Sequence, residues 1–139
     1  HVDLVGSDLR MTGEPEDVGR LLRAGLYHQA MLDRREHRGD AAARLLTEMA
    51  ARWPDDGDVR VLAVESQLRD SRDAAQALAS VDALLPSLQD PRLQRNATLL
   101  RAYAMLDLGM KDSARAIVEK LATDNPASTR YRALADSLK

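Results

Sequence analysis

The side chains best suited to acid–base or metal chemistry are few in this chain and lie far apart. The three histidines are His1, His28 and His37. His28 and His37 are the only two expected on one helix, and their separation of nine residues turns them to nearly opposite sides of it. A helical metal pair needs ligands three or four residues apart. The sequence therefore predicts no metal site.

The neighbours Glu36 and His37 are the one place where a general base could be sought. The surrounding segment DRREHRGD, residues 33–40, is typical of a solvated helix end, whose cations lie favourably against the C-terminal dipole. The chain also has no GxGxxG, GxxxxGK[ST] or GxSxG motif, so the common phosphate-binding loops and the nucleophile elbow are missing. We therefore expect no catalytic residue, no cofactor and no enzyme activity.

Composition points to one globular domain with no affinity for nucleic acid. The chain has 139 residues, is 45% hydrophobic and 30% charged, and carries a net charge of -2. No overall positive field exists to hold a polyanion. Cysteine is absent, and no apolar run approaches the ~20 residues needed to span a bilayer, so we expect a soluble chain. The compartment stays open between cytoplasm, periplasm and attachment to a membrane through a lost N-terminal segment.

Helical periodicity occupies nearly the whole chain after the first residues. We expect an extended N-terminal arm at 1–13 and a helical domain at 14–139 containing seven helices. Capping residues and prolines suggest where each helix begins and ends. The expected limits are Pro15 to Gly39, Asp40 to Trp53, Asp56 to Arg69, Asp70 or Ser71 to Leu85, Pro91 to Gly109, Asp112 to Asp124, and a last helix opened by Asn125 and Pro126.

One pattern of residues occurs three times: an Ala, apolar residues four and seven positions later, and a Pro at position twelve. Its copies are Ala42, Leu46, Met49 and Pro54, then Ala74, Leu78, Val81 and Pro86, then Ala114, Val118, Leu121 and Pro126. The first three residues of each copy share one helix face, and the proline ends that helix. Small residues twelve positions earlier, Ala30 and Ala102, suit a close crossing with a preceding antiparallel helix. In the second copy Leu62 occupies this position beside Ala63, so the phase of its first helix is open.

This pattern resembles the tetratricopeptide repeat (TPR) family, most closely in ATLLRAYAMLDLGMKDSARAIVEKLATDNP, residues 97–126. The resemblance covers Leu22 to Lys139. It implies an all-α fold, a right-handed superhelical stack of about three antiparallel helix pairs plus a C-terminal capping helix. A different α-solenoid or a plain antiparallel bundle would share the same prolines.

The family resemblance also implies a concave groove, lined by the first helix of each pair, that receives a peptide or a helix of another protein. On this chain the groove-facing residues would be Tyr27, Met31, Arg34, Leu99, Tyr103 and Leu106. Tyr and Arg are common interface anchors. Tyr103 is equally suited to the core, and for Leu99 and Leu106 the core is favoured, because the helix around them is apolar nearly all round. The family's carboxylate clamp needs Lys on first helices, and Lys111, Lys120 and Lys139 are not there.

Two functions remain open at this point. The first is a non-catalytic protein–protein interaction scaffold or assembly subunit that binds another protein or peptide, with a subunit of a membrane-associated complex as one candidate. The second is a fragment of a longer structural solenoid that acts as a spacer and has no binding role of its own. The polar faces of the last helix favour a C-terminal cap, and so the first function.

Overall fold

The computed structural model describes residues 15–139, and the expected arm at 1–13 lies outside them. Within this range the chain forms seven α-helices, one short 3-10 helix and no β-strand. The all-α class predicted from the sequence is therefore confirmed for these residues. The helices are α1 (Pro15–Arg35), α2 (Gly39–Arg52), α3 (Gly57–Arg69), α4 (Ala74–Leu84), η1 (Leu85–Ser87), α5 (Pro91–Asp107), α6 (Lys111–Asp124) and α7 (Thr129–Ser137).

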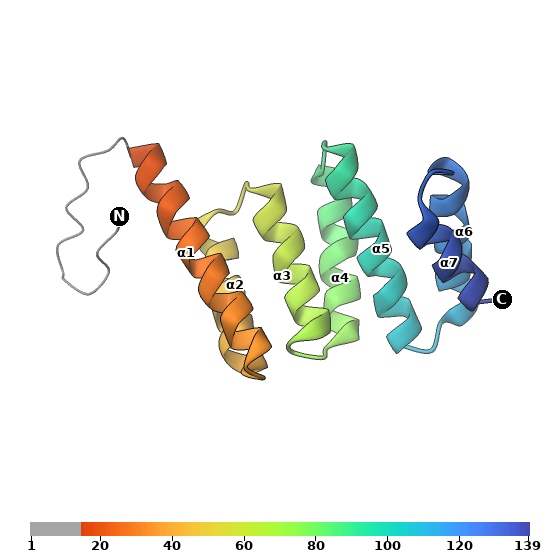
Figure 1. The fold of residues 1–139 in the computed structure, drawn as a ribbon, viewed down its shortest axis with the longest axis horizontal. Helices are drawn as coiled ribbons and strands as arrows, with labels where there is room; N and C mark the ends of the chain where they lie inside the picture. The colour runs from red at the N-terminus through yellow and green to blue at the C-terminus, as the bar shows by residue number, and fades with distance from the viewer. Residues whose placement is uncertain (1–14) are drawn as a thin grey trace.

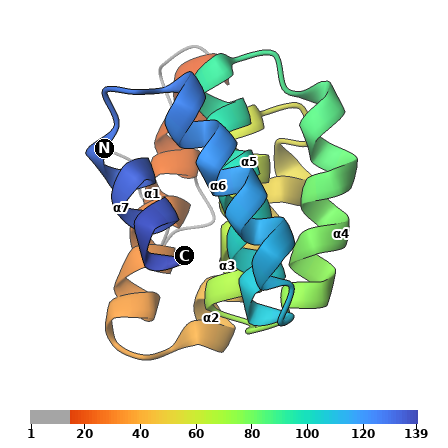
Figure 2. The same cartoon turned by 90° about the vertical axis from the view of Figure 1, so that its right-hand side faces the viewer.

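The helices are arranged in chain order along the longest axis of the molecule, and consecutive helices run in opposite directions (Figure 1). Each helix packs against the next one in the sequence, and α3 also packs against α5. The backbones of α1 and α3 are not in close contact. Seen from the C-terminal end, α1 and α7 lie on one side of the stack and α4 on the other (Figure 2).

Three of the expected helix boundaries are confirmed by the residues that form them. Asp56 caps α3 by accepting a hydrogen bond from the Val59 backbone N–H at 3.2 Å. Asp90 caps α5 in the same way, and Pro91 is the first helical residue, where its missing N–H costs nothing. Gly109 follows the end of α5 with a φ of 79°, a left-handed conformation that glycine adopts without strain.

The expected end of α1 and the expected start of α4 are wrong by a few residues, whereas α1 begins at Pro15 as expected. α1 stops at Arg35, well before Gly39, because His37 adopts a φ of 62° and the Arg38 N–H bonds back to the Asp33 carbonyl at 2.7 Å. α4 begins at Ala74 and is capped by Asp73, whose side chain accepts from the Gln76 N–H. Asp70 does not cap α4, because an ion pair occupies its carboxylate.

Three further expected N-terminal caps are also wrong. α2 begins at Gly39, so Asp40 lies within its first turn and makes no cap. α6 begins directly after Met110 without a side-chain cap, and Asp112 again lies in the first turn. α7 is capped by Ser128, not by Asn125. In α2 and α6 the acidic residue of the first turn still lies near the positive end of the helix dipole, which explains the misleading sequence signal there.

The repeated triplet marks buried positions in its first and third copies. Ala42, Leu46 and Met49 of α2 are buried, as are Ala114, Val118 and Leu121 of α6. In α4 the buried triplet is instead displaced by three residues from the expected one. It consists of Ala77, Val81 and Leu84, whereas Ala74 and Leu78 are half-buried.

The small residue of the middle helix pair is Ser66, not Leu62 or Ala63. Ala30, Ser66 and Ala102 recur at intervals of 36 residues, and their side chains are 0%, 3% and 0% exposed. Each of the three lies on a different odd-numbered helix: Ala30 on α1, Ser66 on α3 and Ala102 on α5. This regular interval gives the phase of α3 that the sequence pattern left open.

Candidate functional site

A groove with a volume of about 820 Å³ opens on the side formed by the odd-numbered helices. Its floor is apolar and comes mainly from α3 and α5, with Tyr27 of α1 and Tyr103 of α5 beside it. The apolar lining consists of Ala24, Met49, Val61, Leu62, Leu68, Leu93, Leu99 and Leu100, and the polar lining of Arg23, Asp58, Glu65, Arg69, Arg92, Asn96 and Arg130. We call this feature the groove.

Helical spacing explains why these residues share one surface. On α3, Leu62, Glu65 and Arg69 follow each other at intervals of three and four residues. On α5, Asn96, Leu99 or Leu100, and Tyr103 do the same. Residues so spaced lie on one helix face, and the two faces meet because α3 and α5 pack against each other.

Ion pairs join successive odd-numbered helices along the groove. Arg23 of α1 lies with its Nε 2.9 Å from an Asp56 carboxylate oxygen at the start of α3. Arg92 at the start of α5 donates to Asp58 of α3 at 3.0 Å. The hydrogen bond to Asp58 raises the pKa of Arg92. These two arginines are therefore neutralised within the chain.

Two other arginines of the groove have no such partner. Arg69 on α3 and Arg130 on α7 are both exposed, and neither forms an ion pair with any side chain described in residues 21–139. Arg69 is next to Asp70, but both carboxylate oxygens of Asp70 are already engaged by Arg34. Among the side chains of residues 21–139, the groove therefore presents two arginines without an ion-pair partner, on different helices.

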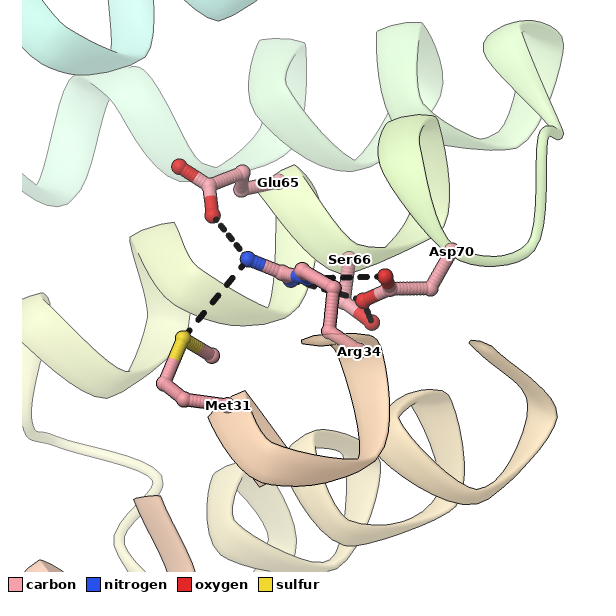
Figure 3. Close-up of polar contacts among 5 residues, drawn as sticks. All are labelled: Met31, Arg34, Glu65, Ser66 and Asp70. Carbon is pink, nitrogen blue, oxygen red and sulfur yellow. Dashed lines mark hydrogen bonds and ion pairs between the residues drawn. The ribbon is translucent and has the colours of Figure 1, made fainter. Parts of the chain in front are cut away.

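Arg34 does not line the groove, and its side chain connects α1 to α3 (Figure 3). Its Nε and Nη2 donate to the two oxygens of Asp70 at 2.8 and 2.7 Å, and its Nη1 donates to Glu65 at 3.0 Å. Ser66 adds a hydrogen bond to Asp70 at 2.7 Å, and the Met31 sulfur lies 3.8 Å from Arg34 Nη1. The arrangement spans the space between two helices whose backbones do not touch.

The electrostatics of this cluster are those of a structural ion pair. Burial by itself raises the pKa of Asp70, but hydrogen bonds from Arg34 and Ser66 outweigh burial and hold the pKa below its ordinary value. The hydrogen bond to Asp70 raises the pKa of Arg34 in return. Both groups thus stay charged near neutral pH, and neither can exchange a proton readily. Arg34 also holds Glu65, which forms part of the groove wall.

The six residues expected in a binding surface fall into two sets. Tyr27, Leu99 and Tyr103 line the groove together: Tyr27 is 41% exposed, Tyr103 is half-buried and Leu99 is buried. Met31, Arg34 and Leu106 lie outside its lining. Met31 packs against the cluster around Leu46, Leu106 against the cluster around Val118, and Arg34 forms the ion pairs above. A role in binding stays a prediction for all six.

The contribution of α3, which supplies six of the groove residues, was not predicted from the sequence. They could not be chosen without the phase of that helix. The signal that would have found them is Ser66, which lies midway between Ala30 and Ala102. With Ser66 placed in the helix crossing, Leu62, Glu65 and Arg69 turn toward the groove.

A second ionisable cluster lies at the end of α1. Asp33 is buried at the end of α1, where Arg38 and Gln29 donate to it at 2.9 and 3.0 Å. The hydrogen bond from Arg38 lowers the pKa of Asp33, so this pair stabilises the α1–α2 turn. Among the described residues, no group of three or more His, Cys, Asp or Glu side chains could hold a metal ion. No helix in residues 15–139 combines the length and apolar character needed to cross a membrane.

No protein-family model, curated protein or solved structure matches this chain. The groove and the arrangement of the helices around it are therefore the features from which a function can be inferred.

Proposed function

We propose that this protein is a non-catalytic interaction scaffold that binds a segment of another protein in the groove. The observation that carries the proposal is the composition of this surface. An apolar floor, flanked by an exposed and a half-buried tyrosine, extends across α1, α2, α3 and α5, and Arg130 of α7 lies at its edge. Aromatic side chains next to an apolar floor are the typical anchors of protein interfaces.

We also propose that the helix pairs form a right-handed superhelical stack similar to that of TPR proteins. Two regularities support this proposal: the interval of 36 residues between Ala30, Ser66 and Ala102, and the buried Ala/apolar/apolar triplet in α2, α4 and α6. The triplets begin at Ala42, Ala77 and Ala114, which are 35 and 37 residues apart. Such spacing is close to the ~34 residues of a TPR unit.

A polypeptide segment fits the groove better than a small substrate does. Small-molecule sites are enclosed clefts that bury most of their ligand. This groove is open and is lined by residues of five helices, as a surface for an elongated ligand would be. Its acidic groups are also engaged, since Asp58 pairs with Arg92 and Glu65 with Arg34, which leaves neither carboxylate free as a general base.

Affinity capture with matched variants tests the proposal. The tagged protein is used to capture partners from its host, in parallel with Tyr27→Ala and Asn96→Arg, which remove an anchor and place a bulky charge in the groove. Leu21→Ala is the control, because Leu21 is also on α1, is 46% exposed and does not line the groove. We expect both groove variants to weaken capture at least about tenfold, while the control binds as the wild type does.

The alternative function, a structural spacer, predicts a different result. A spacer would capture no partner, or would capture partners equally well with all three variants. Either outcome would contradict the proposed binding role of the groove. A partner that is lost only with the groove variants supports it, whether that partner is a cytoplasmic protein, a periplasmic protein or a subunit of a membrane-associated complex.

A further inference from the structure

We infer that the groove selects a polypeptide segment in which acidic residues are interspersed with apolar ones. This inference rests on the proposed function and specifies the chemistry of the partner. Two observations carry it: the apolar floor, which requires apolar side chains in the ligand, and the charge balance of the groove, which requires carboxylates.

The charge balance follows from counting partners within the chain. Of the four arginines that line the groove, Arg23 is neutralised by Asp56 and Arg92 by Asp58. The other acidic residue of the lining, Glu65, is engaged by Arg34 from outside. Arg69 and Arg130 remain exposed and have no carboxylate partner among the described side chains. The lining itself holds four arginines and two carboxylates, and so has an excess of positive charge, although the whole chain has a net charge of -2.

The positions of these two arginines also set the direction of the ligand. Arg69 belongs to α3 and Arg130 to α7, with α5 between these two helices along the stack (Figure 1). A ligand that reaches both must cross the face of α5 that carries Asn96, Leu99 and Tyr103. The segment therefore runs across the helices, with its carboxylates toward the two ends and its apolar side chains over α5. Arginine suits this role because its guanidinium binds a carboxylate through two parallel hydrogen bonds.

A nucleic acid is a poorer fit to the same surface. Phosphate binding along a strand requires several cations in succession. Here the same lining includes the carboxylates of Asp58 and Glu65, which would repel phosphates even while ion-paired. An acidic polypeptide can avoid these carboxylates by placing apolar residues there, so we favour a protein segment.

Selection from a library of short random peptides displayed on phage tests the inference. We expect peptides selected on the wild-type protein to be enriched in Asp and Glu among apolar residues. Synthetic versions should bind about tenfold more weakly to the double variant Arg69→Gln, Arg130→Gln, because two charged contacts are lost. The control is Arg44→Gln, Arg132→Gln. Both residues of this control are exposed arginines outside the groove, and Arg132 is two positions after Arg130.

The possible outcomes separate this inference from the proposed function. Acidic peptides that lose affinity with the Arg69 and Arg130 variant but not with the control support it. Peptides without acidic enrichment that are nevertheless weakened by Tyr27→Ala overturn the inference and leave the proposed function standing. Failure to select any peptide that is sensitive to Tyr27→Ala and Asn96→Arg overturns both. A single-stranded RNA oligonucleotide is tested in the same way. If it binds the wild type more tightly than any selected peptide does, and the Arg69 and Arg130 variant does not bind it, the assignment to a protein segment is overturned.

Discussion

Arg34 and Asp70, 36 residues apart, form a two-bond ion pair with N···O distances of 2.8 and 2.7 Å. Asp70 has only 2% of its side chain exposed and Arg34 has 13%. The pair connects α1 to α3, whose backbones are not in close contact. The side-chain hydrogen bonds of Arg34 therefore connect the first odd-numbered helix directly to the second.

The first prediction is that Arg34→Ala lowers the free energy of unfolding by about 2 kcal/mol, because it leaves the buried Asp70 carboxylate without its main donor. Arg34→Lys should cost less, since it keeps the charge but cannot supply two parallel bonds. Urea unfolding measures both. Arg35→Ala is the control, because Arg35 is the exposed neighbour at the end of α1. Equal stability of Arg34→Ala and the control would show that the ion pair contributes nothing.

The second prediction concerns acid stability. The pKa values of Asp70 and Asp33 are lower in the folded chain than their ordinary values, so the unfolded chain binds protons at a higher pH. These carboxylates therefore stabilise the fold above about pH 4, the ordinary pKa of Asp, and lose this contribution as the pH falls through their folded values. The measurement is the urea concentration at the unfolding midpoint, from neutral pH to about pH 3. We expect this concentration to decrease steadily as the pH falls through the acidic part of the range.

The matched variants for this pH series are Asp70→Asn and Asp112→Asn. Asp70→Asn should be less stable at neutral pH and should depend less on pH in the acidic range, because one of the responsible carboxylates is gone. Asp112 is almost fully exposed, at 95% of its side chain, so its variant should lose only the small helix-dipole contribution and keep most of the wild-type dependence on pH. An unchanged acid slope in Asp70→Asn would contradict the assignment.

The third prediction tests the buried triplet of α4. Ala77→Leu should destabilise the protein by about 1–3 kcal/mol, because Ala77 is only 1% exposed and an added isobutyl group overpacks the crossing. Ala42→Leu and Ala114→Leu should cost similar amounts. Ala74→Leu should be much milder, and the exposed Ala127→Leu nearly neutral. If Ala74→Leu lowers the melting temperature as much as Ala77→Leu does, the buried triplet of α4 begins at Ala74, as expected from the sequence.

The fourth prediction concerns the start of α7. Ser128→Ala should cost about 1 kcal/mol, since the Ser128 hydroxyl oxygen accepts from the Tyr131 N–H at 3.2 Å. Pro126→Ala should have a smaller effect, because Pro126 lies outside the helix. Ser113→Ala, in the first turn of α6 but not at a cap, is the control. Chemical unfolding measures the stability of all three variants. If Pro126→Ala loses more stability than Ser128→Ala, the proline and not the serine cap mainly determines where α7 begins.

Helix content and most helix positions could be predicted because local signals agree with one another. The period of apolar residues, the Asp56 and Asp90 caps and Gly109 all act within one or two helical turns. The register of α4 could not be predicted in this way. Positions three residues apart lie on nearly the same side of a helix, so the triplet beginning at Ala74 and the one beginning at Ala77 give similar patterns in an alanine-rich segment.

The candidate site was predictable only where the helix phase was known. Tyr27 and Tyr103 belong to the first and third helix pairs, whose phase follows from Ala30 and Ala102. The α3 side of the groove depends on Ser66, which does not stand out in the sequence because it is polar. The partner of Arg34 could not be predicted either, since Asp70 comes close to it only after two helix pairs have packed.

The packing of each helix against its neighbours in the sequence also determines how the chain can fold. Apart from α3 with α5, the helices in close contact are consecutive, so each contact closes only a short loop. Chains of this kind have a low contact order and fold quickly, often one unit at a time during synthesis. A nascent chain that has emerged from the ribosome as far as α4 already contains both Arg34 and Asp70. We therefore expect this ion pair to join the first two helix pairs before α5 has emerged from the ribosome.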